Sequence, residues 1–118
     1  MKSCWETYKG KQIFFAHYDH MSIAEYRAEI EAVEQELFKR PQNSVLLLMD
    51  TAGVILSPEA LNLAKNTALR SRPYIRKAAI LGMGGPRKVL LDIVAKFSGV
   101  NVTGFDSLEQ AKEHLAQP

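Results

Sequence analysis

Each of two aspartates follows an apolar segment, in a position where a carboxylate can take part in acid–base chemistry. Asp50 ends the apolar run at 45–49, and Asp19 follows the apolar run at 13–16. If the two runs form neighbouring parallel strands, both carboxylates lie at the sheet edge where ligands usually bind. Two carboxylates in contact would have one raised pKa, which suits proton transfer. The alternative is that each carboxylate accepts hydrogen bonds from its own loop.

A glycine-rich turn at the same edge supplies further candidates for ligand binding. Backbone N–H groups in a turn between a strand and a helix attract anions. The spacing at 82–88 fits neither a dinucleotide-binding loop, which needs glycine where Arg87 stands, nor a P-loop. The alternatives are a weak anion site and a purely structural turn. The residues that we expect to meet a ligand at this edge are Asp50, Thr51, Ser57, Gly84, Gly85 and Arg87.

The segment His-Tyr-Asp-His at 17–20 offers three side chains that could ligate a metal. On a strand, His17 and Asp19 share one face, and His20 begins the loop. Two imidazoles and a carboxylate can hold zinc or iron. No second cluster completes the set, because the remaining histidine, His114, lies near the other end of the chain. We therefore expect a solvated strand end, with no bound metal and no cofactor.

Length and composition fit one globular domain spanning residues 1–118, with 47% hydrophobic and 24% charged residues. No segment approaches the roughly 20 apolar residues of a membrane span, so we expect no transmembrane segment. The N-terminal residues lack the apolar core of a signal peptide, so we expect a cytoplasmic protein. The single cysteine, Cys4, excludes an intrachain disulfide, and we expect it to be a packing or half-buried residue.

Positive charge is concentrated in residues 65–96, which hold eight lysines and arginines against one aspartate. Such a segment could bind an anionic membrane or nucleic acid. The alternative, which we favour, is that these charges lie on different faces of two helices and a loop. We expect no specific nucleic-acid partner.

The elements that would position these residues alternate along the chain. Strands at 3–8 and 12–19, joined by a Lys-Gly turn, form an antiparallel hairpin. The later strands are expected at 44–50, 77–83 and 101–105, and the helices at 22–40, 57–72, 87–98 and 107–115. This order predicts an α/β fold with a mainly parallel sheet and right-handed crossovers.

The predicted topology leaves one surface without a cover. Right-handed crossovers between strands in sequential order place every crossover helix on one face of the sheet. The runs at 13–16, 45–49 and 78–81 are nevertheless apolar on both faces, and the helix at 87–98 is apolar well beyond one stripe. Something must cover the second apolar face, and we expect a homodimer.

Three segments resemble the SpoIIAA-like bacterial proteins of the STAS fold, which is also the fold of anti-anti-sigma factors. They are Pro-Gln-Asn-Ser-Val-Leu-Leu-Leu-Met-Asp at 41–50, Arg-Pro-Tyr-Ile-Arg-Lys-Ala-Ala-Ile-Leu-Gly at 72–82 and Phe-Asp-Ser-Leu-Glu-Gln-Ala at 105–111. The resemblance extends from about residue 13 onward. It implies a superhelix of alternating strands and helices and a non-enzymatic module.

The resemblance also implies a role for Ser57. In anti-anti-sigma factors, a serine or threonine at the start of the helix after the central strand accepts a phosphate that controls binding of a partner kinase. Ser57 occupies the nearest position, although Pro58 follows it and the family's Asp-Ser-Ser-Gly-like cluster is absent. The alternative is that Ser57 is a plain helix N-cap.

Together, these observations predict a regulatory or ligand-binding module whose site is the carboxyl edge of the sheet. The bound species would be a partner protein or a small anionic or apolar ligand, the last because the fold is also compared with CRAL-TRIO lipid carriers. One alternative is a small enzyme that uses Asp19 and Asp50 as an acid–base pair. The other is a binder of anionic membranes or nucleic acid through residues 65–96.

Overall fold

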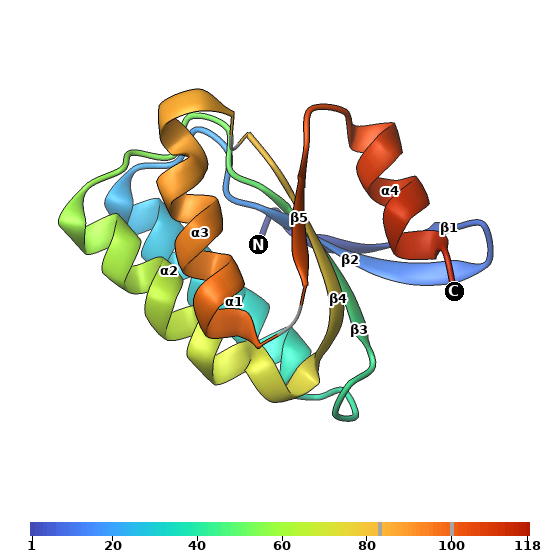
Figure 1. The fold of residues 1–118 in the computed structure, drawn as a ribbon. Helices are drawn as coiled ribbons and strands as arrows, with labels where there is room; N and C mark the ends of the chain where they lie inside the picture. The colour runs from blue at the N-terminus through green and yellow to red at the C-terminus, as the bar shows by residue number, and fades with distance from the viewer. Residues whose placement is uncertain (83, 100) are drawn as a thin grey trace.

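The computed structural model describes residues 1–82, 84–99 and 101–118 and has the predicted order of strands and helices (Figure 1). The strands are β1 (Cys4–Tyr8), β2 (Lys11–His17), β3 (Val45–Asp50), β4 (Ile75–Leu81) and β5 (Val102–Phe105). The helices are α1 (Ile23–Leu37), α2 (Pro58–Ser71), α3 (Lys88–Ser98) and α4 (Leu108–Ala116), with single 3-10 turns at Arg72–Tyr74 and Gly85–Arg87. None of the described helices is long and apolar enough to cross a membrane.

The described strands form one five-stranded sheet in the order β1-β2-β3-β4-β5. β1 and β2 pair antiparallel, and the other neighbours pair parallel. The predicted α/β class and the N-terminal hairpin are thus confirmed. Because β2 to β5 run parallel, their carboxyl ends meet at one edge, where His17, Asp50 and Leu81 occupy adjacent register positions.

Helices cover both faces of the sheet. The crossover helices α1, α2 and α3 lie on one face, as predicted, and α4 lies on the other (Figure 1). Neighbouring residues of one strand therefore enter different cores: Phe14 belongs to the larger core, beneath the crossover helices, and Phe15 belongs to the smaller core, beneath α4. The smaller core joins Ile13, Phe15, Leu48 and Ala79 to Ala111 and Leu115. The second apolar face, from which we expected a homodimer, thus has a cover within the chain.

Several strand boundaries differ from the prediction by one residue, and the start of β4 and the end of β2 differ by two. β4 begins at Ile75, two residues early, because the turn at Arg72–Tyr74 leads straight into the sheet. Its predicted end, Met83, lies outside the described residues. β2 ends at His17 rather than at Asp19, because the chain turns soon afterwards at a residue with positive φ.

Glu29 fixes the N-terminal end of β1 to α1. It is 6% exposed and accepts hydrogen bonds from the N–H of Ser3 (2.8 Å), the hydroxyl of Ser3 (2.6 Å) and the N–H of Lys2 (3.3 Å). The Ser3 hydroxyl also accepts from the N–H of His17 at 2.9 Å. Burial raises the pKa of Glu29, but the donated hydrogen bonds outweigh it, so that the net shift is downward.

We expect Glu29→Gln to lower the free energy of unfolding by about 1–3 kcal/mol at pH 7, because two donors on Ser3 lose a charged acceptor. A carboxyl with a lowered folded pKa contributes stability above its unfolded value of 4.5, and that contribution is lost as the pH falls through the folded pKa. The difference between the two proteins should therefore shrink in urea denaturation at pH 3. Glu31→Gln, on the exposed side of α1, is the control. An equal difference at both pH values would contradict this role.

Candidate functional site

The carboxyl ends of β3 and β4 lie side by side, and the segments that leave them form the candidate site. The pairing of the two strands ends with Asp50 opposite Leu81. The loop at 51–57 leads from β3 into α2, and the turn at 82–87 leads from β4 into α3. The two segments are in direct contact through the side chain of Arg87.

Arg87 holds the two segments together with its guanidinium group. Nε donates to the carbonyl oxygen of Gly82 (2.8 Å), Nη1 to that of Val54 (2.8 Å) and Nη2 to that of Thr51 (2.6 Å). We call this arrangement the Arg87 latch. Each guanidinium nitrogen has a main-chain acceptor, so Arg87 brings positive charge to the edge while its hydrogen bonds fix the loops.

The residues around Thr51 pack against the end of β4. Thr51 is 2% exposed, and its N–H and hydroxyl donate to the carbonyl of Leu81 at 3.0 and 2.6 Å. Half-buried Asp50 accepts a hydrogen bond from the N–H of Ala52 at 3.1 Å, which closes an Asx turn. Gly82 has φ +88°, and a Cβ there would lie 2.7 Å from the Ala52 nitrogen, so this close backbone approach requires glycine.

Ser57 and the two glycines of the turn lie at the ends of the helices. Ser57 is the N-cap of α2, where its hydroxyl oxygen accepts from the N–H of Ala60 at 3.1 Å and Pro58 takes the first helical position. Gly84 and Gly85 are exposed, and a Cβ on either would have no other atom within 4 Å. The predicted N-cap of α2 is confirmed, and the glycine-rich turn has an open surface.

Two large apolar side chains are exposed beside the Arg87 latch. Val54, whose carbonyl the latch holds, is 2% exposed, whereas the next residue, Ile55, is 57% exposed. Val89, two residues beyond Arg87, is 43% exposed, and its neighbour Lys88 is also exposed. The sequence analysis noted that the helix at 87–98, which contains Val89, is apolar beyond one stripe, but it did not identify Ile55.

The two aspartates proposed as an acid–base pair have different nearest partners. Asp19 Oδ1 is buried without a hydrogen-bond partner among the described residues, and it lies 3.6 Å from His17 Nδ1. Asp50 Oδ1 accepts from the Ala52 N–H of its own loop. Asp19 thus lies near the imidazole of His17. Asp50 accepts a hydrogen bond from its own loop, which was the alternative to the acid–base pair.

The proposed metal-ligating group of His17, Asp19 and His20 does not assemble. His20 has φ +56°, its N–H donates to the Ala52 carbonyl at 2.8 Å, and its ring lies against Gly53. The turn at His20 therefore takes its side chain away from His17. Among residues 1–82, 84–99 and 101–118, the group of potential metal ligands that does assemble has other members.

This group consists of Cys4, Glu6 and His17, each of which offers one ligand atom within 4.8 Å of the others. Cys4 is exposed, so the expectation that it is a packing or half-buried residue is wrong. The hairpin brings the group together, since Cys4 pairs with Phe15 in the antiparallel register. The short Lys-Gly turn fixes that register, so it was the one sequence signal that could have revealed the group.

Three of the eight basic residues in the 65–96 segment lie in different parts of the molecule, whereas Lys65 and Lys96 both lie over the ring of Phe97. Arg70 of α2 pairs with Glu34 of α1 at 2.8 Å. Lys77 Nζ donates to the carbonyl of His114 at 2.7 Å, near the end of α4 on the opposite face of the sheet. Arg87 donates to main-chain carbonyls at the carboxyl edge of the sheet. The positions of Arg70, Lys77 and Arg87 agree with the alternative that residues close together in the sequence do not all share one surface.

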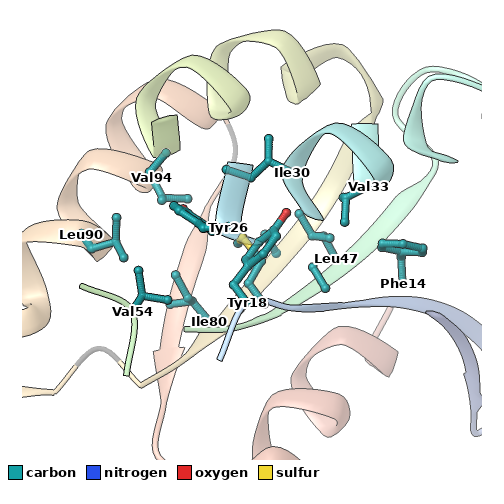
Figure 2. Close-up of a cluster of buried hydrophobic side chains, with 14 of the residues drawn as sticks. Phe14, Tyr18, Tyr26, Ile30, Val33, Leu47, Val54, Ile80, Leu90 and Val94 are labelled. Atoms are coloured by element: carbon teal, nitrogen blue, oxygen red, sulfur yellow. The ribbon is translucent and has the colours of Figure 1, made fainter. Parts of the chain in front are cut away.

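The larger core contains a cavity of about 50 Å³ between the sheet and the crossover helices. Tyr18 and Tyr26 line it together with aliphatic side chains such as Leu47, Ile80 and Val94 (Figure 2). Burial raises the pKa of Tyr26 to about 12, so this phenol is neutral at ordinary pH. An apolar cavity that holds benzene has a volume of about 150 Å³, so this smaller one has room for water but not for a lipid.

Comparison of the chain with protein-family models, curated proteins and solved structures gives no match.

We expect Arg87→Met to lower the free energy of unfolding by about 1–3 kcal/mol, because charged donors to three carbonyls are lost. Hydrogen exchange should accelerate at the amides of residues 51–54 but not in the β1–β2 hairpin. Lys88→Met removes the neighbouring exposed charge and should leave both measurements unchanged. If both variants behaved alike, the latch would not be what fixes these loops.

Proposed function

We propose that this chain is a cytoplasmic, non-catalytic regulatory module of the STAS-like type that binds a partner protein through the carboxyl edge of its sheet. The binding surface, which we call the edge surface, consists of Ile55, Ser57, Lys88 and Val89. The observation that carries the proposal is the Arg87 latch, which fixes the loops beside two exposed apolar side chains.

The physical argument concerns the free energy of association. A loop that is already fixed loses little conformational entropy on binding, so more of the contact energy contributes to affinity. Apolar side chains at the centre of an interface supply much of that energy, and a polar rim surrounds them. Ile55 and Val89 are 57% and 43% exposed, and Ser57 and Lys88 supply the polar rim.

The other proposed occupants of this edge have less support. A small anion would find only two free N–H groups on Arg87, because the other three donate to main-chain carbonyls. A lipid would need a larger volume than the cavity of about 50 Å³ in the core. An acid–base pair would need Asp19 and Asp50 to face each other, but each has a different partner. A protein needs only an exposed, fixed surface.

The resemblance to anti-anti-sigma factors supplies the regulatory part of the proposal. A phosphate on Ser57 would lie at the N-terminus of α2, where the helix dipole stabilises negative charge. It would also place about two negative charges next to the apolar part of the edge surface. We therefore propose that phosphorylation of Ser57 would weaken binding of the partner.

The test is quantitative capture of partners from the native host by the wild-type protein and by point variants. We expect Ile55→Asp and Val89→Asp each to reduce capture of the same partner by about tenfold or more, because a charge enters the centre of the interface. Leu69→Asp, at a 43% exposed position on α2, is the matched control and should capture the partner normally.

Two outcomes would contradict the proposal. One is a partner that all three aspartate variants capture equally well. The other is a concentration-dependent dimer in sedimentation that Ile55→Asp and Val89→Asp dissociate, since the occupant of the edge surface would then be a second copy of the chain. Native mass spectrometry of the same preparations would also show any phosphate on Ser57.

A further inference from the structure

A group of three potential metal ligands lies at the open end of the hairpin, on the face of the sheet that carries α4. Cys4 and Glu6 are two residues apart on β1 and therefore share one face of the sheet. Their register partners, Phe15 and Ile13, belong to the smaller core on that face. His17 is two residues beyond Phe15 and shares its face. One ligand atom from each of Cys4, Glu6 and His17 lies within 4.8 Å of the other two.

We propose that Cys4, Glu6 and His17 bind a zinc ion. A thiolate, an imidazole and a carboxylate are the three ligand types that zinc prefers, and the soft thiolate disfavours magnesium and calcium. Three protein ligands leave the fourth tetrahedral position for water or an incoming ligand. The thiolate and the carboxylate together neutralise the ion's two positive charges.

The distances are compatible with zinc after a small closure. Zinc bonds of about 2.0–2.3 Å place tetrahedral ligand atoms about 3.3–3.8 Å apart. Atoms within 4.8 Å of one another therefore have to approach by at most about 1–1.5 Å. Rotation about side-chain bonds can supply this movement, because Cys4 is exposed and the other two residues are half-buried.

The surroundings of His17 orient its ring for metal binding. The ring stacks on Phe15 with a centroid separation of 4.0 Å. Its Nδ1 lies 3.6 Å from Asp19 Oδ1, the buried oxygen that has no hydrogen-bond partner among the described residues. A proton on Nδ1 would supply that missing donor and leave the Nε2 lone pair for the metal. Carboxylate, histidine and zinc are commonly arranged in this way.

The neighbouring contacts also position the other two ligands. Ser3, the residue before Cys4, is buried and held by Glu29, so the backbone of Cys4 is fixed. Lys112 donates to Glu6 Oε1 at 3.0 Å. A carboxylate has lone pairs on both oxygens, so Glu6 can keep this partner and bind the ion. The charge of Lys112 opposes that of the ion, and we expect its removal to tighten binding.

The test is a titration of the reduced, tag-free protein with Co²⁺, a spectroscopic substitute for zinc, followed by competition with Zn²⁺. Because Cys4 is the chain's only cysteine, a near-ultraviolet thiolate-to-cobalt charge-transfer band can arise only from Cys4. We expect this band in the wild-type protein, and we expect added Zn²⁺ to abolish it.

Variants test each ligand separately. Cys4→Ser should remove the band, and Glu6→Gln and His17→Gln should weaken zinc binding at least about tenfold. Asp19→Asn should weaken it by about 10- to 100-fold through the orientation of His17. Lys112→Gln should bind more tightly than the wild type. His20→Gln and His114→Gln are matched controls, because both histidines lie outside the group, and they should bind normally.

The proposal would be overturned if the wild-type protein gave no charge-transfer band, or if His17→Gln bound zinc as tightly as His20→Gln. Circular dichroism of each metal-free variant separates loss of ligands from loss of fold. A zinc-dependent rise in melting temperature, present in the wild type and absent in Cys4→Ser, is an independent measurement, because a ligand that binds only the folded state stabilises it.

Discussion

The burial of β3 on both faces is the constraint on which the rest of this structure depends. Leu47 contributes to the core beneath the crossover helices, and Leu48, which is fully buried, contributes to the core beneath α4. A slip of one residue in the register would exchange the two sets of side chains, so the pairing with β2 and β4 is strongly specified. That register places Asp50 at the carboxyl edge, with His17 on one side and Leu81 on the other.

The edge that this register creates is closed by side chain-to-backbone hydrogen bonds rather than left open as a pocket. Backbone groups at the ends of strands need partners once they are removed from water. The carbonyls of Thr51, Val54 and Gly82 obtain theirs from Arg87, and that of Leu81 from Thr51. These hydrogen bonds hold the two loops in one arrangement, which is the premise of the proposed binding of a partner protein.

The features that could be predicted from the sequence are those with local causes. The alternation of strands and helices and the cap at Ser57 follow from apolar spacing and from Ser-Pro, and the structure confirms both. The Arg87 latch spans 36 residues to Thr51, and no local pattern reports such a contact. The sequence showed correctly that the central strands are apolar on both faces. The second face packs against α4, a helix whose side of the sheet is not fixed by a crossover, so its position could not be predicted.

In the hairpin, the chemical surroundings of Cys4 depend on how β1 pairs with β2. Glu6 lies two residues from Cys4 in the sequence, and the antiparallel register adds His17 from β2. β1 is also an edge strand, with one neighbour in the sheet, so its position depends on contacts outside the sheet. Glu29 holds its first end, and Glu113 of α4 binds Lys9 at the turn. A metal bound by Cys4, Glu6 and His17 would add a third contact, at the end of the hairpin where β1 begins.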